Sequence, residues 1–381
     1  MKIGVIGYGS RVSSMFEIVK SYDLGAEITA IMDIDFEAVK ERLKKYGQDE
    51  TKIAFYDDAV KMLDEEELDG VMIGTRCSTH TLYAVEVLKR DIPLFLEKPV
   101  STKMEDLILL QKASETTKSQ VVVSFPLRVT PIVIQAKEII DSGKIGTVEN
   151  VQAINNVPYG GVYYHHWYRD DSITGGLFMQ KATHDFDYIN YILGTKPTMV
   201  CAMESKQIFK GDKPVGLNCK TCAEQYTCPE GAFVMEHLKY DSNHGYNCCY
   251  AKDTGNHDSA SAIVRYESGM HVSYSQNFYA RKEAAARGAR FLGYNGTVEF
   301  DWYKDEIKVF MHDASGSQTY KLNTVQFKHG GGDEVLALNF LRVMQKAEKS
   351  VAPLEDGILS ALMCLKAKES AESNQFVDIK F

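Results

Sequence analysis

Two lysines and a histidine are the side chains of this sequence best suited to acid-base chemistry. Lys181 and His184 stand three residues apart in a segment expected to be helical, so they share one face of it. Lys98 follows the apolar run 94–96 almost directly. Histidine titrates near neutral pH without help, and burial or a neighbouring charge can bring a lysine into the same range. These residues predict a site that transfers a proton.

A glycine-rich turn near the N-terminus predicts a phosphate-binding site. Gly7 and Gly9 follow the apolar run 3–6 and precede a helical pattern that opens with Ser10, Arg11 and Val12. Gly7 permits a tight turn, and Gly9 lets the backbone approach a pyrophosphate at the helix N-terminus, where the helix dipole favours anions. Val12 stands where a third glycine would allow close packing, so we expect the helix to lie slightly farther from the sheet.

Asp33 extends this interpretation to a dinucleotide. It ends the second apolar run, near the roughly 20-residue interval at which a carboxylate accepts hydrogen bonds from the adenosine ribose. Such a carboxylate repels a 2′-phosphate, which favours NAD over NADP; Arg11 weakens that preference, because a guanidinium pairs well with phosphate. The alternative is that Gly7 and Gly9 only form a strand-helix turn and that Asp33 caps a helix.

The elements around these residues predict an N-terminal domain over 1–125. Short apolar runs alternate with amphipathic helical patterns, which is typical of a doubly wound parallel sheet covered on both faces, the Rossmann fold. The expected strands cover Ile3–Ile6, Ile28–Met32, Gly70–Gly74, Pro93–Leu96 and Val121–Ser124, and the expected helices Val12–Val19, Glu37–Tyr46, Thr79–Lys89 and Met104–Thr116.

A second, α+β domain with a large, mostly antiparallel sheet is expected over 126–381. Several runs alternate apolar and polar residues, as strands with one solvated face do. We expect a helix at Pro131–Ser142, strands at Val148–Ile154, Ala260–Tyr266, His271–Gln276, Arg290–Leu292 and Thr297–Phe300, and closing helices at Glu334–Glu348 and Asp356–Ala371. Residues 209–254 show little periodicity and predict an irregular, cysteine-rich insertion.

Three motifs resemble the Gfo/Idh/MocA family of sugar and cyclitol oxidoreductases. They are Glu97-Lys98-Pro99, the Gly175-Gly176 pair before a helix, and Lys181-Ala182-Thr183-His184. Many members carry Asp where this chain has Gln180, and this chain instead resembles the subgroup with Lys-Ala-Thr-His. The segment His329-Gly330-Gly331-Gly332-Asp333 resembles a motif of the same subgroup. The resemblance covers essentially the whole chain. It implies that Lys98 approaches both the nicotinamide and the substrate hydroxyl.

The resemblance implies an NAD-dependent oxidoreductase acting on a ring hydroxyl of a sugar, glycoside or cyclitol. Alcohol oxidation needs a base with a pKa near the working pH, so we expect His184 as the principal acid-base group and Lys98 and Lys181 to polarise the reacting oxygen, with the three roles interchangeable. The alternatives are a glycosidase that oxidises and re-reduces its sugar and a non-catalytic nucleotide- or sugar-sensing protein. Expected cofactor contacts are Gly7, Gly9, Ser10, Arg11, Asp33, Thr75, His80, Glu97 and Lys98.

An aromatic and polar stretch precedes the Gly-Gly pair and is a candidate pocket wall. Rings with hydrogen-bonding edges suit a sugar, and Tyr164, His165 and Trp167 are the expected contacts. A buried aromatic corner is the alternative. His329 is a further expected substrate contact.

Five of the eight cysteines cluster in the insertion and predict a structural zinc site. Cys219, Cys222 and Cys228 are closely spaced, as thiolate ligands of a tetrahedral zinc are. The subgroup resemblance implies Cys248 as the fourth ligand, with Cys249, His237 and His244 as alternatives. Free thiols are the competing interpretation.

Composition excludes several partners. A net charge of −9 argues against nucleic acid, which requires clustered Lys and Arg. No run approaches the roughly 18 apolar residues of a membrane span, and the N-terminus lacks the pattern of a secretory signal. We therefore expect a cytoplasmic protein, and the resemblance implies a homodimer or homotetramer.

Overall fold

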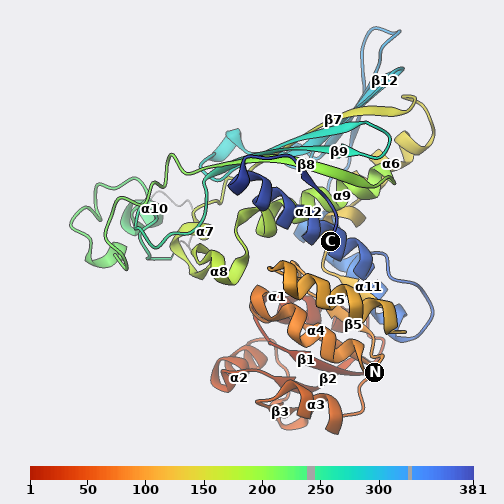
Figure 1. The fold of residues 1–381 in the computed structure, drawn as a ribbon. Coiled ribbons are helices and arrows are strands. Elements are labelled where there is room, and N and C mark those ends of the chain that lie inside the picture. Colours follow the sequence, from red (N-terminus) through yellow and green to blue (C-terminus); the bar gives the residue numbers. More distant parts are fainter. Residues whose placement is uncertain (238–244, 325–327) are drawn as a thin grey trace.

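The computed structural model describes residues 1–237, 245–324 and 328–381. They form two lobes, each built on one sheet (Figure 1). The N-terminal lobe carries a six-stranded sheet in the order β3-β2-β1-β4-β5-β6, and every neighbouring pair is parallel. The strands are β1 (Lys2–Ile6), β2 (Glu27–Met32), β3 (Ala54–Tyr56), β4 (Gly70–Ile73), β5 (Leu94–Leu96) and β6 (Val121–Val123).

Helices cover both faces of this sheet, so β4, β5 and β6 are buried throughout. The helices are α1 (Ser10–Ser21), α2 (Phe36–Lys45), α3 (Ala59–Glu65), α4 (His80–Leu88) and α5 (Met104–Thr116), with short 3₁₀ turns η1 (Glu50–Lys52) and η2 (Cys77–Thr79). The predicted fold class of the N-terminal domain is confirmed.

The second lobe carries a nine-stranded sheet in the order β14-β13-β12-β11-β7-β10-β9-β8-β15, in which all pairs are antiparallel except β7 with β10. This confirms the expected mostly antiparallel sheet. Its strands are β7 (Val148–Asn156), β8 (Pro197–Ser205), β9 (Ser259–Tyr266), β10 (His271–Asn277), β11 (Ala286–Gly293), β12 (Gly296–Asp301), β13 (Glu306–Met311), β14 (Gln318–Lys321) and β15 (Val377–Asp378).

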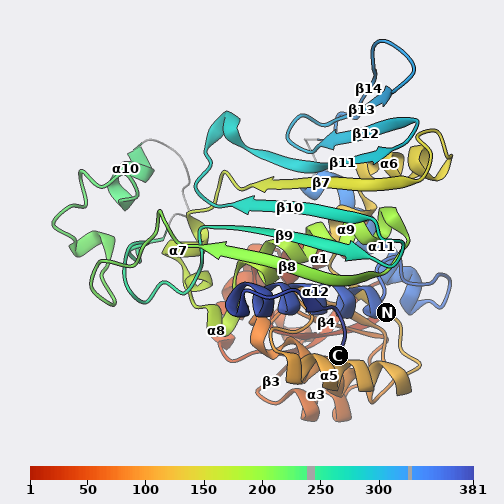
Figure 2. The ribbon, with the colours of Figure 1, turned by 45° about the horizontal axis from the view of Figure 1, so that its top comes forward.

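The second lobe's helices and turns are η3 (Pro126–Val129), α6 (Pro131–Asp141), α7 (Val162–His165), η4 (Trp167–Arg169), α8 (Asp171–Thr174), η5 (Phe178–Ala182), α9 (Thr183–Leu193), η6 (Cys219–Thr221), α10 (Ala232–His237), η7 (Lys282–Ala284), η8 (Lys328–Gly331), α11 (Gly332–Met344) and α12 (Leu354–Ser373). The longer helices α6, α9 and α12 lie on one face of the second lobe's sheet, α7 and α10 lie beyond its end (Figure 1), and the other face is open in Figure 2. Strand burial alternates accordingly, for example in β9 and β10.

The C-terminal helices return to the N-terminal lobe. The Phe340 ring in α11 packs on Phe95 of β5 with centroids 5.7 Å apart, and the N–H of Val123 in β6 donates to the carbonyl of Ala352 at 2.8 Å. The closing segment therefore packs against both lobes, although a domain boundary at residue 125 assigns it to the second domain alone.

Some short or irregular elements were not anticipated. The edge strand β3 has only three half-buried residues, too few for a periodic signal. Strand β11 begins earlier than expected because Gly288 lets the neighbouring backbone come close: a Cβ there would lie 1.9 Å from the Phe300 oxygen. In the described part of the chain, no helix is long and apolar enough to cross a membrane.

Candidate active site

The turn between β1 and α1 is shaped for a close backbone approach. Gly7 has φ +81°, and a Cβ on it would lie 2.7 Å from the Thr75 nitrogen, so only glycine fits without strain. Gly9 precedes the first residue of α1, and a Cβ there would lie 3.3 Å from the Gly74 oxygen. Ser10 and Arg11 open the helix, as the sequence predicts for a pyrophosphate site.

Val12 does not impair the packing of α1, contrary to expectation. Its side chain is fully buried, and a Cβ at Gly74 would lie 2.1 Å from the Val12 Cγ2 atom. The small residue that permits close approach therefore stands just after β4 instead of on the helix.

Asp33 follows β2 and is held by main-chain donors. Its Oδ2 accepts from the Tyr8 N–H at 2.8 Å, and its Oδ1 accepts from Ile34 and Asp35. Its carboxylate is thus fixed beside the glycine turn, in the position predicted for a ribose partner.

Arg11 does not serve as the free guanidinium that the sequence suggested. It makes two 2.7 Å bonds to Asp333, at the start of α11, and one of 3.0 Å to Glu97. Its Nη2 also donates to Ser124. Because these partners engage its donors, the argument from Arg11 toward a 2′-phosphate loses its basis.

His80 and Thr75 lie behind the strand ends. The His80 ring is buried, with Nδ1 2.8 Å from the Pro99 oxygen and Nε2 3.2 Å from the Thr75 oxygen. Burial lowers the pKa of His80. Its contacts are those of a residue that joins two loops at the cofactor edge; direct cofactor contact stays a prediction.

Lys98 links the two lobes. It follows β5, and its Nζ donates to the Gln180 backbone oxygen in η5 at 3.1 Å. Burial of the ammonium group lowers the pKa of Lys98 to about 8, and the charge of Lys181 acts in the same direction. The carboxyl end of β5 thus presents an amine that is partly deprotonated near neutral pH.

Lys181 lies in a π-helical turn, η5, and not in the α-helix that the sequence suggested. Such turns occur often at functional sites. The Lys181 amine, in a side chain only 6% exposed, donates to the Tyr159 hydroxyl at 2.5 Å. Burial lowers the pKa of Lys181. Burial opposes ionisation of Tyr159, but the charges of Lys181 and Arg287 outweigh it and lower the pKa of the phenol.

His184 differs electrostatically from what its residue type suggests. Burial, followed by the charge of Lys98, holds its pKa well below the usual range, so the ring is neutral. Its Nδ1 is buried without a hydrogen-bond partner among the described residues, and its ring meets Phe125 edge-on at 5.8 Å. An imidazole with so low a pKa accepts a proton poorly, which moves Lys98 ahead of His184 as the main proton acceptor.

Arg287 and Tyr159 are site residues that sequence reasoning missed. Arg287, on β11, donates from Nε to Asp185 of α9 at 2.9 Å. Asp185 also accepts from Asn155 and Tyr274. No local motif marks either residue; alternation along β11 was the available signal, and it did not tell which arginine points inward. Below, the interlobe cluster means Lys98, Tyr159, Lys181, His184 and Arg287.

The expected pocket wall divides into two parts. Tyr164 belongs to a second hydrophobic core, and its hydroxyl donates to the His257 oxygen. His165, the next residue, is also buried, and its Nδ1 contacts the Asn247 oxygen. They occupy the aromatic corner that was the alternative. Trp167 instead stacks on Tyr168, and the Arg76 guanidinium of the other lobe lies 3.8 Å from its ring centroid.

His329 reaches the interlobe region. It adopts φ 45° and ψ 37°, and its Nδ1 lies 2.9 Å from Asp333 Oδ2. Its charge is one of those that lower the pKa of His184. This position fits the expected substrate contact, which stays a prediction.

The insertion does not confirm the zinc site predicted from Cys219, Cys222, Cys228 and Cys248. Among the residues that the structure describes, no three His, Cys, Asp or Glu side chains are arranged to hold a metal. His237 stacks on Phe233, and His244 lies outside the described residues.

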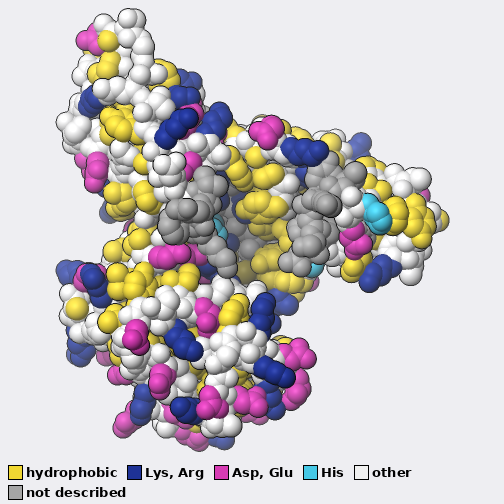
Figure 3. Space-filling view, turned by 180° about the vertical axis from the view of Figure 1, so that it is seen from behind, with side chains coloured by type: hydrophobic (Ala, Val, Ile, Leu, Met, Phe, Trp, Pro, Cys, Tyr) yellow, Lys and Arg dark blue, Asp and Glu magenta, His cyan; other side chains and the backbone are white. Residues whose placement is uncertain are grey.

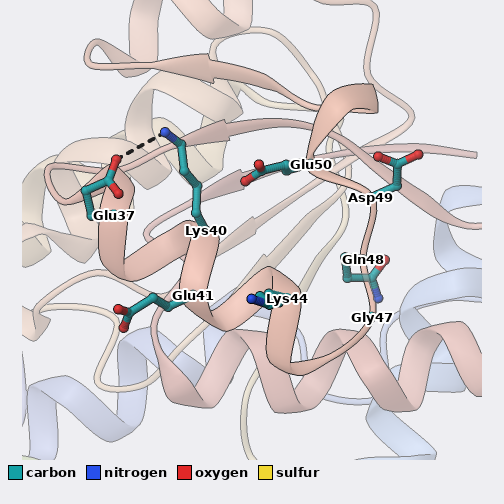
Figure 4. A pocket seen from close by; sticks show the side chains of 8 residues that line it. All are labelled: Glu37, Lys40, Glu41, Lys44, Gly47, Gln48, Asp49 and Glu50. Atoms are coloured by element: carbon teal, nitrogen blue, oxygen red, sulfur yellow. Dashed lines mark hydrogen bonds and ion pairs between the residues drawn. The ribbon is translucent and has the colours of Figure 1, made fainter.

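Two hollows are visible on the surface. Figure 3 shows the molecule hollowed between its lobes. A second hollow lies on the outer side of the N-terminal lobe, between α2 and η1 (Figure 4), and is lined by Glu37, Lys40, Glu41, Lys44, Gly47, Gln48, Asp49 and Glu50. Its exposed charges of both signs include a Lys40–Glu37 pair, and none of the predicted site residues lines it.

Fold and site together define a two-domain dinucleotide-binding oxidoreductase. A profile described as the oxidoreductase family, NAD-binding Rossmann fold, matches residues 1–125, and one described as the GFO/IDH/MocA C-terminal domain matches residues 133–299. The chain belongs to the Gfo/Idh/MocA family of NAD-binding oxidoreductases.

Individual relatives agree over nearly the whole length. The chain is 27% identical over 372 residues to YteT of Bacillus subtilis (strain 168), covering 87% of this chain and 86% of that protein. It is 27% identical over 386 residues to myo-inositol 2-dehydrogenase of Thermotoga maritima, covering 100% and 99%. A structure of levoglucosan dehydrogenase with NADH and levoglucosan has a TM-score of 0.78 at 19% identity and full coverage of both chains, which shows a shared fold.

Proposed function

We propose that this protein is an NAD-dependent dehydrogenase that oxidises a CH–OH group of a sugar or cyclitol ring. The observation that carries the proposal is the position of Lys98, whose amine follows a central Rossmann strand, contacts the opposite lobe and has a pKa near 8. The myo-inositol and levoglucosan dehydrogenases to which the chain is similar support this substrate class.

The glycine turn and Asp33 fit a bound NAD. Gly7 and Gly9 let the turn pack tightly against Thr75 and Gly74 at the N-terminus of α1, where a pyrophosphate binds in such folds, and Asp33 offers a fixed carboxylate to the ribose. This carboxylate, together with the paired state of Arg11, favours NAD over NADP. When bound, NAD supplies the acceptor for a hydride.

The interlobe cluster supplies the group that accepts the proton and the groups that bind the reacting oxygen. Oxidation removes a hydride from the carbon and a proton from the oxygen of the same CH–OH group, which leaves a carbonyl. The neutral Lys98 amine accepts the proton. Lys181 and Tyr159, joined by their hydrogen bond, orient and polarise the same oxygen, and neutral His184 offers a further hydrogen bond.

The test combines the enzyme with NAD and a panel of sugars, cyclitols and aryl glycosides while NADH absorbance and aglycone release are followed together. NADH formation that Lys98→Met abolishes, and that Lys112→Met on the exposed face of α5 preserves, supports the proposal. Aglycone release without NADH would replace it with the redox glycosidase. NAD binding without either product would favour the sensing role.

We also propose that the protein pairs with itself through the open face of the nine-stranded sheet. Ile154 of β7, Met203 of β8 and Ile263 of β9 project from that face and are 43%, 70% and 51% exposed. Large apolar side chains gathered on one exposed face favour association, and the homo-oligomer implied by the family resemblance agrees with this surface.

A further inference from the structure

The interlobe cluster contains three basic side chains, one of which keeps a donor without a partner among the residues that the structure describes. Lys98, Lys181 and Arg287 all act on the pKa of His184, so their charges lie near one another. The Lys98 amine contacts a backbone oxygen and the Lys181 amine a phenol. Within the described ranges, the one ion pair that these three basic side chains make with a carboxylate joins Arg287 to Asp185.

The Arg287 side chain is held by Asp185, but not all of its hydrogen-bond donors have an acceptor among the described residues. Asp185 holds its Nε, and the other Asp185 oxygen accepts from Asn155 at 2.7 Å and Tyr274 at 2.8 Å. The Nη2 atom of Arg287 is buried and has no hydrogen-bond partner in the part of the chain that the structure describes. A buried donor without an acceptor is costly, so this group calls for an acceptor supplied by a ligand.

We propose that the substrate ring carries a carboxylate, which binds Arg287 Nη2 while the reacting hydroxyl lies against Lys98. This inference rests on the proposed dehydrogenase function and names its substrate class: a sugar acid of the hexuronate type. Arginine suits a carboxylate because its planar donors match the two oxygens.

Tyr159 lies near both the groups proposed to bind the reacting hydroxyl and the arginine proposed to bind the carboxylate. Tyr159 contacts Lys181 directly, and the charges of both Arg287 and Lys98 act on its phenol. Arg287 therefore lies near the reacting groups. A carboxylate gives the unpartnered Arg287 Nη2 donor an acceptor, which a neutral hydroxymethyl group provides less well.

The decisive comparison uses isosteric substrates on the unmodified enzyme. Methyl glycosides of glucuronate and galacturonate are compared with their uronamides and with the parent methyl glucoside and galactoside, by NADH formation and by calorimetric titration of the NADH-bound protein. We expect kcat/KM and affinity to favour at least one uronate over its uronamide by about 100-fold. Equal or better use of the neutral partners in both pairs overturns the inference.

Arg287 is then tested by substitution. Arg287→Gln is expected to bring the uronate-to-uronamide ratio close to one, and Arg287→Lys, which retains a cation for Asp185, to give an intermediate ratio. Arg290→Gln on the same strand is the matched control, because Arg290 is exposed and pairs with Glu299 at the surface. An unchanged ratio in folded Arg287→Gln overturns the role of this residue.

The two proposals fail in different ways. NADH formed only from neutral sugars refutes the carboxylate and leaves the dehydrogenase function standing. Selective uronate binding without NADH formation from any substrate refutes the dehydrogenase function and upholds the anion site. Preference for a ring phosphate ester, tested with glucose 6-phosphate, over all uronates also overturns the carboxylate.

Discussion

The amine of Lys181 donates a 2.5 Å hydrogen bond to the hydroxyl of Tyr159, which joins a π-helical turn to the segment that follows β7. We expect Tyr159→Phe to lower kcat by about 10- to 100-fold, because the phenol no longer orients Lys181 toward the reacting oxygen. Tyr294→Phe, at a ring that is 88% exposed, is the control and is expected to leave kcat unchanged. Steady-state kinetics of both variants at saturating NAD decide the matter, and equal kcat values would remove Tyr159 from the mechanism.

The pKa of Lys98 predicts the pH dependence of oxidation. Only the neutral amine accepts a proton, so kcat/KM for alcohol oxidation should rise as pH increases through about 8. In the reverse direction the protonated amine is the active form, so carbonyl reduction should fall over the same range. Initial rates in both directions between pH 6 and 10 measure this; a profile flat through pH 8 would contradict the assignment.

Asp33 predicts the choice of cofactor. Asp33→Ala removes both the ribose acceptor and the charge that repels a 2′-phosphate, so we expect KM for NAD to rise and the preference for NAD over NADP to shrink by about tenfold or more. Asp57→Ala, at an exposed carboxylate that follows β3, serves as the control. Parallel titrations with NAD and NADP give the ratio, and an unaltered ratio in Asp33→Ala would argue against the ribose contact.

The ion pair between Arg11 and Asp333 predicts a loss of stability. Arg11→Met leaves the Asp333 carboxylate, only 1% exposed, without its main partner, and breaking a buried pair in this way costs about 3 kcal/mol in the free energy of unfolding. Urea denaturation measures the change, with Arg290→Met as the surface control. Arg11 counteracts burial and lowers the pKa of Asp333, so its contribution is present above the carboxyl's ordinary pKa and is lost as pH falls below about 4. The wild type and the variant should therefore converge in acid.

The open sheet face predicts self-association. Ile263→Glu places a charge at the centre of the exposed apolar residues and should shift the protein toward monomer. Light scattering coupled to size exclusion measures the mass, and Lys112→Glu, on the exposed face of α5 in the other lobe, tests whether any added negative charge has this effect. A monomeric wild type would contradict the pairing.

The sequence was informative where chemistry depends on neighbours along the chain. Gly7, Gly9 and Asp33 follow parallel strands at the expected places, because a strand-turn-helix pattern is local. Alternating polarity likewise located β9 and β10. Lys98 and Lys181 were recognised individually, and the contact between their segments brings them into one cluster.

The sequence was uninformative where a property depends on distant residues. Asp333, the partner of Arg11, lies 322 residues away, and Gly74, which accommodates Val12, belongs to another strand end. Tyr159 and Arg287 acquire their chemistry from Lys181 and Asp185, which no local pattern connects to them. The neutral state of His184 reflects burial and surrounding charge, neither of which residue type reveals.

The return of the closing helices to the N-terminal lobe bears on how the chain can be divided. A fragment that ends at Phe125 would expose the Phe95 ring that Phe340 covers, and it would leave the Val123 N–H without the Ala352 oxygen. The Rossmann sheet is thus fully covered only after translation of the last helices, so the nucleotide-binding half should be insoluble when expressed alone and should regain solubility when residues 332–381 are supplied with it.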